Sequence, residues 1–404
     1  MTKERLETEI SGIAGALKKQ GKRQLAKCIE ENWDKTASEY SSELNTYQAG
    51  KGVEKELLIA FEKELERLGT TDNLKHKILA SLQKRRVLQT APHLGVTEGP
   101  RMFCINWLAS LSVPKTEYYV VGMFSGIPFS NRSRPGRING RGEGINLFGS
   151  NMQDGLVYRS VIPEKLLQSV AGLPEKLKEF FPKAVVGDSY TRWALLGCAN
   201  IERHILKNKN LVYLDINEVV AKYLVQVLKN KNHIIYKIFF EPETRKEFVR
   251  IFPNEIMFYS ASSDGKYEKM KNITFADLGN LKNSQDLIKE LEEKRFCPAL
   301  IIGFLTLAFL NEFKCLGSFA QVEYLPVYQE KLAKLKCMKN RNIKKVPTAN
   351  LTTGVSDQNI DLYPVDIILG EKWQIDEKIL FGELLLPIKK TLLESYFTGD
   401  ERRK

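Results

Sequence analysis

The sequence predicts a mixed α/β fold, with a Rossmann-like, mainly parallel sheet flanked by helices. Three observations predict it. Residues 1–85 show the spacing of apolar side chains typical of helices and contain no strand signal. Residues 86–280 alternate short apolar strands with helices, as parallel α/β folds do. Residues 281–404 return to a mainly helical pattern, so we expect an N-terminal helical region, an α/β core and a helical C-terminal third.

The N-terminal region predicts helices from its periodicity. Ile13, Leu17, Leu25, Ile29 and Trp33 lie four or eight positions apart among charged residues, as one buried stripe would. Two further helices are expected, Val53–Leu68, which ends near Gly69, and Asn73–Lys84.

A strand–loop–helix–strand unit opens the core. Val87–Thr90 is a short apolar strand, and the loop Ala91–Pro100 after it is rich in proline and glycine. Arg101–Leu111 follows as a helix and Tyr118–Val121 as a second buried strand. Two parallel strands joined by a crossover helix are the starting unit of a Rossmann-like sheet.

Alternating elements continue after a long loop, Ser125–Asn151, whose NG pair at 139–140 favours a small hairpin. The expected strands are Leu211–Leu214, Ile234–Phe240 and Ile256–Ser260. The expected helices are Pro174–Phe181, Asp188–Leu206, Asn217–Leu228, Pro242–Ile251, Gln285–Arg295, Ala299–Phe313, Ser318–Lys336 and Pro387–Phe397.

Composition limits the partners. The chain of 404 residues has 61 Lys and Arg against 49 Asp and Glu, a formal charge of +12. This charge favours anionic partners such as nucleotides, phosphates, carboxylates, nucleic acid or anionic lipid, without choosing among them.

The six cysteines form no C-x-x-C pair and only four histidines occur, so no metal site is evident and neither a zinc site nor a disulfide framework is expected. We expect free thiols in a reducing cytoplasm. The charged N-terminus does not resemble a signal peptide. The longest apolar run, Cys297–Leu310, is shorter than the roughly 20 residues of a membrane-spanning helix, so we expect a buried core helix and no membrane partner.

The first candidate site is the loop Thr90–Thr97. A glycine such as Gly95 or Gly99 lets a ligand approach the backbone, and Thr97 adds a hydroxyl. The N-terminus of the next helix favours an anion, and His93 can donate to a phosphoryl oxygen. We therefore assign His93 and Thr90 as candidate catalytic residues. A purely structural turn is the alternative.

The second candidate is an arginine-rich stretch of the long loop. No acidic residue occurs in it before Glu143, and arginine binds carboxylate or phosphate at two points. It follows the second strand, so we expect it at the same sheet edge as His93, packed over that loop. A solvated basic loop is the alternative. The candidate binding residues here are Ser125, Ser130, Asn131, Arg132, Arg134 and Arg137.

The third candidate is the segment Gly317–Tyr324. Glycine and serine before a helix form an N-cap and an anion site, so Ser318 and Gln321 are further binding candidates. Ordinary capping with an aromatic core explains the segment equally. The remaining histidines, acids and the lysine cluster at 334–345 are read as satisfied, capping or solvated groups, although a nucleic-acid partner stays open.

Two segments resemble a known family. Val87–Pro100 reads VLQTAPHLGVTEGP and Leu316–Glu330 reads LGSFAQVEYLPVYQE. In this order they resemble the cysteine ligase family of bacillithiol synthesis, whose first segment reads V-V-T-G-Q-Q-A-G-L-x-x-G-P. Gly95, Gly99 and Pro100 match, whereas Pro92-His93 replaces two glutamines.

The His-x-Gly string is also similar to the signature of the class I synthetase and nucleotidyltransferase superfamily, with Val96 in place of its second histidine. After the second strand the ligase family has an acidic segment containing histidine, whereas this chain has Phe124–Asn131. The resemblance implies a synthetase-like Rossmann core with added helices and a related ligase-like activity. It does not carry over the substrate chemistry.

The sequence therefore predicts a ligase- or transferase-like enzyme that binds a nucleotide or another anionic small molecule at the carboxyl edge of the sheet. ATP or another adenine nucleotide is the expected cosubstrate. A non-catalytic binding protein of the same fold and a basic nucleic-acid-binding protein are the alternatives. The substrate, the acceptor and the oligomeric state are not fixed by the sequence.

Overall fold

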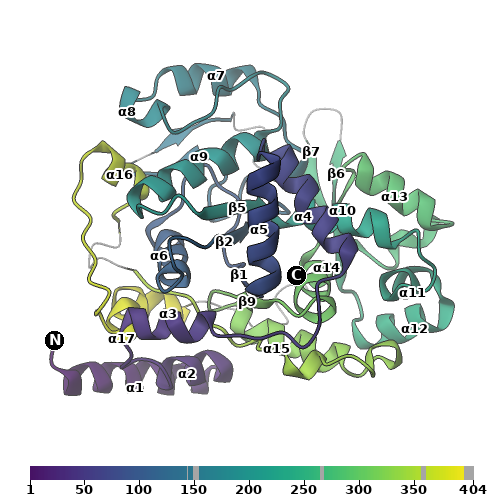
Figure 1. Cartoon of the computed structure of the whole chain (residues 1–404), viewed down its shortest axis with the longest axis horizontal. Coiled ribbons are helices and arrows are strands. Elements are labelled where there is room, and N and C mark those ends of the chain that lie inside the picture. The colour runs from purple at the N-terminus through teal and green to yellow at the C-terminus, as the bar shows by residue number, and fades with distance from the viewer. Residues whose placement is uncertain (143, 149–153, 264–267, 356–360, 395–404) are drawn as a thin grey trace.

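A four-stranded parallel sheet lies at the centre of the computed structural model, which describes residues 1–142, 144–148, 154–263, 268–355 and 361–394 (Figure 1). Its strand order is β5-β2-β1-β9, and the pairing aligns Gln89 with Val121 and Leu88 with Cys315. Every residue of these strands is buried, so the sheet is the core of the fold. The strands are β1 (Val87–Gln89), β2 (Tyr119–Met123), β5 (Leu211–Asp215) and β9 (Lys314–Leu316).

The order of the strands defines where a ligand would enter. From β1 the chain moves outward to β2 and then β5, whereas β9 returns to the other side of β1. In open α/β sheets, ligands bind at the carboxyl ends of the strands where this direction reverses. The reversal lies between β1 and β9, which confirms the Rossmann-like α/β class and places the loops after these strands at the expected edge.

Helices cover the sheet. α5 packs on β2, and both α4 and α9 pack on β5; α4 and α5 cross in front of the sheet in Figure 1. α6 begins with Pro100 at its first position, where a missing N–H costs nothing, and all its residues from Phe103 to Ser110 are buried. These helices are α4 (Lys55–Arg67), α5 (Asp72–Lys84), α6 (Pro100–Ser110), α9 (Tyr190–Ile205) and α10 (Ile216–Val227).

The N-terminal helical region is confirmed. Ile10, Ile13 and Leu17 are buried along one stripe of α1, and a capping box between Thr36 and Glu39 starts α3. α1 packs against the C-terminal helices α17 and α18, along the lower edge of Figure 1. The bounds are α1 (Lys3–Lys19), α2 (Arg23–Glu30), α3 (Ala37–Asn45), α17 (Phe381–Leu385) and α18 (Lys389–Glu394).

A second, antiparallel sheet lies apart from the first, in the order β7-β6-β8. The sequence predicted the strand at Ile256–Ser260 as part of the parallel core, and that placement is wrong. Among the described residues this strand pairs with β7 and β8 only, and both pairings are antiparallel. The bounds are β6 (Ile256–Ser263), β7 (Glu268–Thr274) and β8 (Phe296–Pro298).

The predicted strand Ile234–Phe240 is a helix, α11. A short apolar run does not distinguish strand from helix by its periodicity. Ile234, Ile235, Ile238 and Phe239 are the buried residues, which is helical spacing, and the ring of the N-cap residue His233 accepts from the backbone N–H of Ile235 at 3.2 Å. The other helices are α7 (Glu164–Ala171), α8 (Glu175–Lys178), α12 (Pro242–Ile251), α13 (Ser284–Glu292), α14 (Leu300–Phe304), a π-helix (Leu305–Leu310), α15 (Gln321–Leu332) and α16 (Pro364–Leu369).

The sequence missed β9. It predicted one helix over Ala299–Phe313, whereas the structure has α14, then the π-helix, then the three residues of β9. The apolar run is buried as expected. The sequence did not indicate this strand because it is short and starts with Lys314, a residue type that is depleted in strands. Its Nζ donates to the backbone oxygen of Glu43 at 3.1 Å, which satisfies a buried cation.

The six cysteines are free thiols, and five of them are buried. Among the residues that the structure describes, no helix combines the length and apolar character needed to cross a bilayer.

Replacing Gly317 tests the packing at the end of β9. A Cβ there would lie 2.5 Å from the Cβ of Gln321. The hydrogen bond from the Gln321 side chain to Thr90 limits how far that side chain can move away. We expect Gly317→Ala to lower the free energy of unfolding by about 1–3 kcal/mol in urea denaturation. The control is Gly12→Ala in the exposed middle of α1, where nothing lies within 4 Å and a gain of up to about 1 kcal/mol is expected. Equal stability of the two variants would contradict this account.

Candidate functional site

The loop between β1 and α6 does not leave the sheet at once. The backbone N–H of Leu94 donates to the oxygen of Phe124 at 2.8 Å, and the N–H of Phe124 donates to the oxygen of Pro92 at 3.0 Å. The loop therefore extends the parallel pairing beyond β1 and β2. This pairing holds His93 beside Phe124, just past the carboxyl end of β2.

His93 is half-buried and contacts the arginine-rich loop. Its Nδ1 lies 3.2 Å from Oδ1 of Asn131. Burial lowers the pKa of His93 below its usual 6.5, the Asn131 contact opposes this shift, and the positive charge of Arg101 lowers the pKa further. The ring is therefore mostly neutral at pH 7 and gains a proton more readily when a negative charge arrives.

Arg101 lies in the first turn of α6, directly after the loop that carries His93. Its guanidinium is 4.9 Å from the ring centre of Phe319, which follows β9. Burial lowers the pKa of Arg101, and so does the nearby charge of Arg132, while Glu98 acts in the opposite direction. Arginine nevertheless stays charged in proteins.

We call the three side chains His93, Arg101 and Arg132 the cationic cluster. In the described ranges, neither arginine forms a salt bridge. The N-terminus of α6 adds to this field, because its N-cap residue Gly99 offers no side-chain hydrogen bond to the first N–H groups. Two cations and a helix N-terminus together form a site for an anion.

Glu98 lies near the cluster but is buried close to Glu202 of α9. Burial together with the charge of Glu202 raises the pKa of Glu98 well above its usual value. Burial also raises the pKa of Glu202 to about 7, although hydrogen bonds from Asn106 (3.0 Å) and the hydroxyl of Tyr213 oppose it. Burial therefore favours the protonated form of both carboxyls.

The arginine-rich loop packs on the loop Thr90–Thr97, as predicted for its described residues. The N–H of Asn139 donates to Oγ1 of Thr97 at 2.8 Å, beside the His93–Asn131 contact. Buried Phe129 and Phe148 anchor it, with ring centres 4.5 Å apart. The hairpin β3 (Arg137–Ile138) and β4 (Ile145–Asn146) confirms the predicted hairpin; residues 143 and 149–151 lie outside the described ranges.

The loop's predicted binding residues differ in placement. Ser130, Arg132 and Arg134 are exposed, and Arg134 has a φ of 52°. Arg137 lies on β3, and its Nε is buried without a hydrogen-bond partner in the described part of the chain. Of the loop arginines, Arg132 is therefore the one that the structure joins to the cationic cluster.

Ser125 turns away from the cluster. Its N–H donates to Oδ1 of Asn217 at 2.8 Å, and its buried hydroxyl lies beside Asp215 at the end of β5. Asp215 and Asn217 begin α10, so Ser125 fixes the outer edge of the sheet.

Thr90, Gln321 and Ser318 lie at the reversal between β1 and β9. The hydroxyl of Thr90 donates to the oxygen of Leu316 at 2.9 Å and accepts from Nε2 of Gln321 at 3.0 Å. Ser318 does not cap α15; Ala320 takes that position, because the turn 318–320 delays the start of the helix. The predicted N-cap at Ser318 is wrong for this reason.

Gly95 and Gly99 leave open space. A Cβ at Gly95 would meet only the oxygen of Thr97 at 3.5 Å, and one at Gly99 only Tyr363 at 4.0 Å. Neither glycine is required by local packing, which fits the predicted approach of a ligand to the backbone.

Sequence reasoning missed Arg101 and Phe319 as site residues. The sequence did contain a signal for Arg101. A cation in the first turn of a helix is unfavourable beside the positive end of the helix dipole, so its presence there indicates a role other than stabilising the helix. Phe319 carried no such signal, since its role depends on the pairing of β9 with β1.

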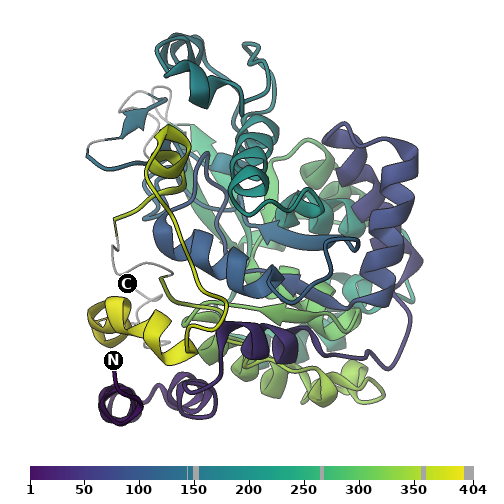
Figure 2. The same ribbon diagram turned by 60° about the vertical axis from the view of Figure 1, so that its left-hand side comes forward.

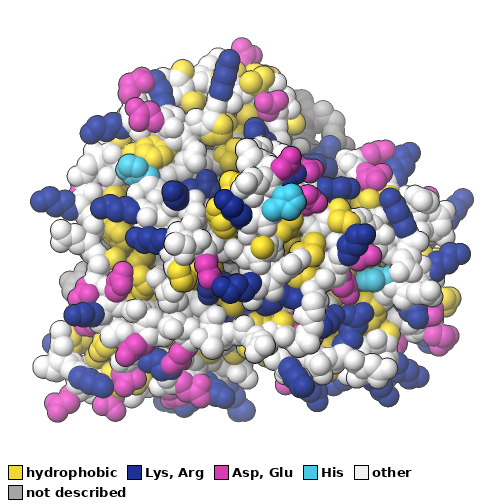
Figure 3. Space-filling model, viewed as in Figure 1, with side chains coloured by type: hydrophobic (Ala, Val, Ile, Leu, Met, Phe, Trp, Pro, Cys, Tyr) yellow, Lys and Arg dark blue, Asp and Glu magenta, His cyan; other side chains and the backbone are white. Residues whose placement is uncertain are grey.

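Two observations limit other site types. Within the described residues, no group of three or more His, Cys, Asp or Glu side chains is arranged to hold a metal ion. On the face shown in Figure 3, basic and acidic side chains are interspersed over the surface.

Comparisons with known proteins give no further guide to this site. No family model, no curated protein and no solved structure matches the chain.

The Glu98–Glu202 pair makes stability depend on pH. The folded-state pKa of Glu202, about 7, lies above its ordinary 4.5, so its contribution is present below about pH 4.5 and is lost as pH rises through 7. Glu202→Gln removes the buried charge and places an N–H donor near the unpaired oxygens of Glu98 and Asn106. We expect Glu202→Gln to be more stable than the parent by roughly 1–3 kcal/mol at about pH 8, in urea denaturation.

The same variant should show little advantage at about pH 5, where the parent is already protonated. Glu330→Gln on the exposed side of α15 serves as the control and should follow the parent at both pH values. A variant that is less stable than the parent at about pH 8 would contradict the protonated pair.

Proposed function

We propose that this chain is an enzyme that binds a nucleotide or another anionic small molecule at the carboxyl edge of its parallel sheet and joins or transfers a group. The observation that carries the proposal is the cationic cluster. His93 and Arg132, from two separate loops, lie near Arg101 in the first turn of α6, and burial favours the neutral form of the nearby Glu98 carboxyl. Such a concentration of positive charge favours the binding of an anion.

Each residue of the cluster has a distinct role in this proposal. Arg101, fixed over Phe319, supplies a two-pronged donor to a phosphate or carboxylate. His93 donates to an oxygen on which negative charge develops, and its lowered pKa lets it take up that proton only with the ligand present. Arg132 closes over the ligand from the exposed side.

A ligase- or transferase-like reaction with ATP or another adenine nucleotide is the form of the proposal that the motif resemblance favours. Thr90 and Gln321 then position the loop rather than react, because their side chains bond each other and the Thr90 hydroxyl also donates to the backbone oxygen of Leu316. The free thiols fit a cytoplasmic protein.

A non-catalytic binding protein with the same site is the second candidate. The hydroxyl of Thr90, predicted as catalytic, is buried and already makes two hydrogen bonds. This observation favours binding without turnover, in which the cluster holds its ligand but activates nothing.

Binding of adenine nucleotides tests the site. We expect ATP, ADP or AMP to bind saturably in isothermal titration calorimetry, and Arg101→Ala or His93→Ala to weaken binding by about tenfold or more, the loss expected for one charge-assisted hydrogen bond. Arg132→Ala should weaken it less, because this side chain is exposed. Lys339→Ala, at an exposed lysine of the 334–345 cluster, is the matched control and should bind as the parent does. Absence of saturable binding, or binding indifferent to Arg101 and His93, would exclude the nucleotide site.

Turnover separates the two candidates. The enzyme proposal predicts that the protein converts ATP to ADP or AMP when a suitable acceptor is present, and that Arg101→Ala loses this activity. Saturable binding with no conversion across a broad panel of small-molecule acceptors would favour the binding protein instead.

A further inference from the structure

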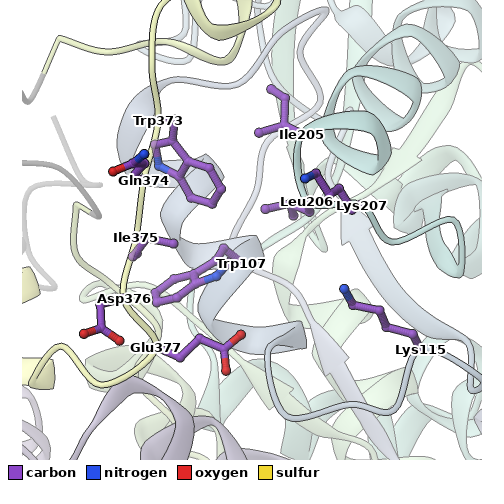
Figure 4. Close-up of a pocket in the computed structure, with 10 residues that line it drawn as sticks. All are labelled: Trp107, Lys115, Ile205, Leu206, Lys207, Trp373, Gln374, Ile375, Asp376 and Glu377. Carbon is purple, nitrogen blue, oxygen red and sulfur yellow. The ribbon is translucent and has the colours of Figure 1, made fainter.

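A groove lies at the opposite edge of the sheet from the cationic cluster. Its volume is about 790 Å³, and it is formed by the second half of α6, the end of α9, the chain before β2 and the segment between α16 and α17 (Figure 4). In Figure 2 that last segment, coloured yellow, runs past α6. We call this the tryptophan groove. Its lining residues are Trp107, Lys115, Ile205, Leu206, Lys207, Trp373, Gln374, Ile375, Asp376 and Glu377.

The position of the groove follows from the parallel sheet. α6 and α9 run back toward the amino ends of the strands, so Trp107 and Ile205 lie near that edge. Lys115 comes just before β2. The groove is therefore separate from the cationic cluster, and binding there is independent of the proposed nucleotide site.

Two of the four tryptophans in the chain form one side of the groove. Trp107 is almost buried, and Trp373 packs edge-on against Phe103 with ring centres 5.2 Å apart. Together with Ile205 and Leu206 opposite, these rings offer apolar surface to a flat molecule (Figure 4). A volume near 800 Å³ is within the range of small-molecule sites, roughly 300–1,000 Å³.

Two lysines face the tryptophans. Figure 4 shows the ammonium groups of Lys115 and Lys207 turned toward the space in front of the rings. Both side chains are exposed, and neither has an ion pair among the residues described. Lys207 follows the end of α9 with a φ of 48°, a conformation that favours glycine, yet a lysine stands there.

Acidic side chains on another side of the groove limit the negative charge that a ligand can carry. Asp376 and Glu377 line the lower part of the groove and are exposed. They would repel a polyanion such as a nucleoside triphosphate, whereas a single negative charge can pair with the lysines away from them.

We propose that the tryptophan groove binds a planar aromatic molecule carrying one anionic group. The ring system lies against Trp107 and Trp373, and the anionic group pairs with Lys115 and Lys207. Stacking supplies most of the affinity and the lysines supply the selectivity for an anion.

A matched pair of fluorescent probes tests the proposal. 8-Anilinonaphthalene-1-sulfonate has the aromatic body and one sulfonate, and N-phenyl-1-naphthylamine has the same body without the charge. We expect energy transfer from tryptophan to the sulfonate probe on titration, with tighter binding than the neutral probe shows.

The charge arm uses Lys115→Glu/Lys207→Glu. This double variant should weaken binding of the sulfonate probe by about tenfold or more, which corresponds to about 1.4 kcal/mol, and leave the neutral probe within about twofold. The control, Lys334→Glu/Lys336→Glu, makes the same change in net charge at exposed lysines outside the groove and should not affect either probe. Equal weakening by both double variants would overturn the role of the groove lysines.

The aromatic arm uses Trp373→Leu, which should weaken both probes to a similar degree. Unchanged binding of both probes in this variant would place them elsewhere and overturn the proposal. Glu377→Gln should strengthen binding of the sulfonate probe by up to a few fold and leave the neutral probe alone. Weaker sulfonate binding in Glu377→Gln would contradict the assignment of one anionic group.

Discussion

The pairing of β1 with β9 is the interaction on which the rest of the structure depends. It joins residues more than two hundred positions apart, and the N–H and hydroxyl of Thr90 both bond the oxygen of Leu316, each at 2.9 Å. The N–H of Lys314 closes the other end on the oxygen of Arg86 at 2.7 Å. Because of this pairing, the loop after β9 reaches the start of α6, and Phe319 comes to lie against Arg101.

Charge is arranged differently at the two ends of the same sheet edge. Beside β5, buried Glu64 bonds Arg67 at 2.7 Å and Lys222 at 2.8 Å, and Glu218 bonds Lys222 at 3.1 Å. Acids and bases are matched there, so that network stabilises the junction of α4 and α10 and needs no ligand. Beside β1, among the described residues, Arg101 and Arg132 form no salt bridge, and burial favours the neutral form of the nearby Glu98 carboxyl. This contrast separates a structural network from a candidate binding site.

Local signals predicted much of the fold, and long-range contacts decided the rest. Helix α12 begins and ends as predicted, and β1, β2 and β5 follow from apolar runs bounded by turn residues. α11 was misread because a seven-residue segment with six apolar or aromatic side chains fits either structure. β9 was missed because three residues become a strand only through a partner far away in the chain. For the site, His93 and Asn131 could be predicted to meet, since both follow adjacent parallel strands, but Phe319 could not.

The titration of His93 tests the central claim, an uncompensated positive charge at the carboxyl edge, most directly. The chain has four histidines, so NMR can follow each imidazole with pH in the full-length protein. The account predicts that His93 titrates below 6.5 in the free protein, and that ATP or inorganic phosphate raises its pKa. A pKa of His93 at or above 6.5 that does not respond to either anion would contradict it.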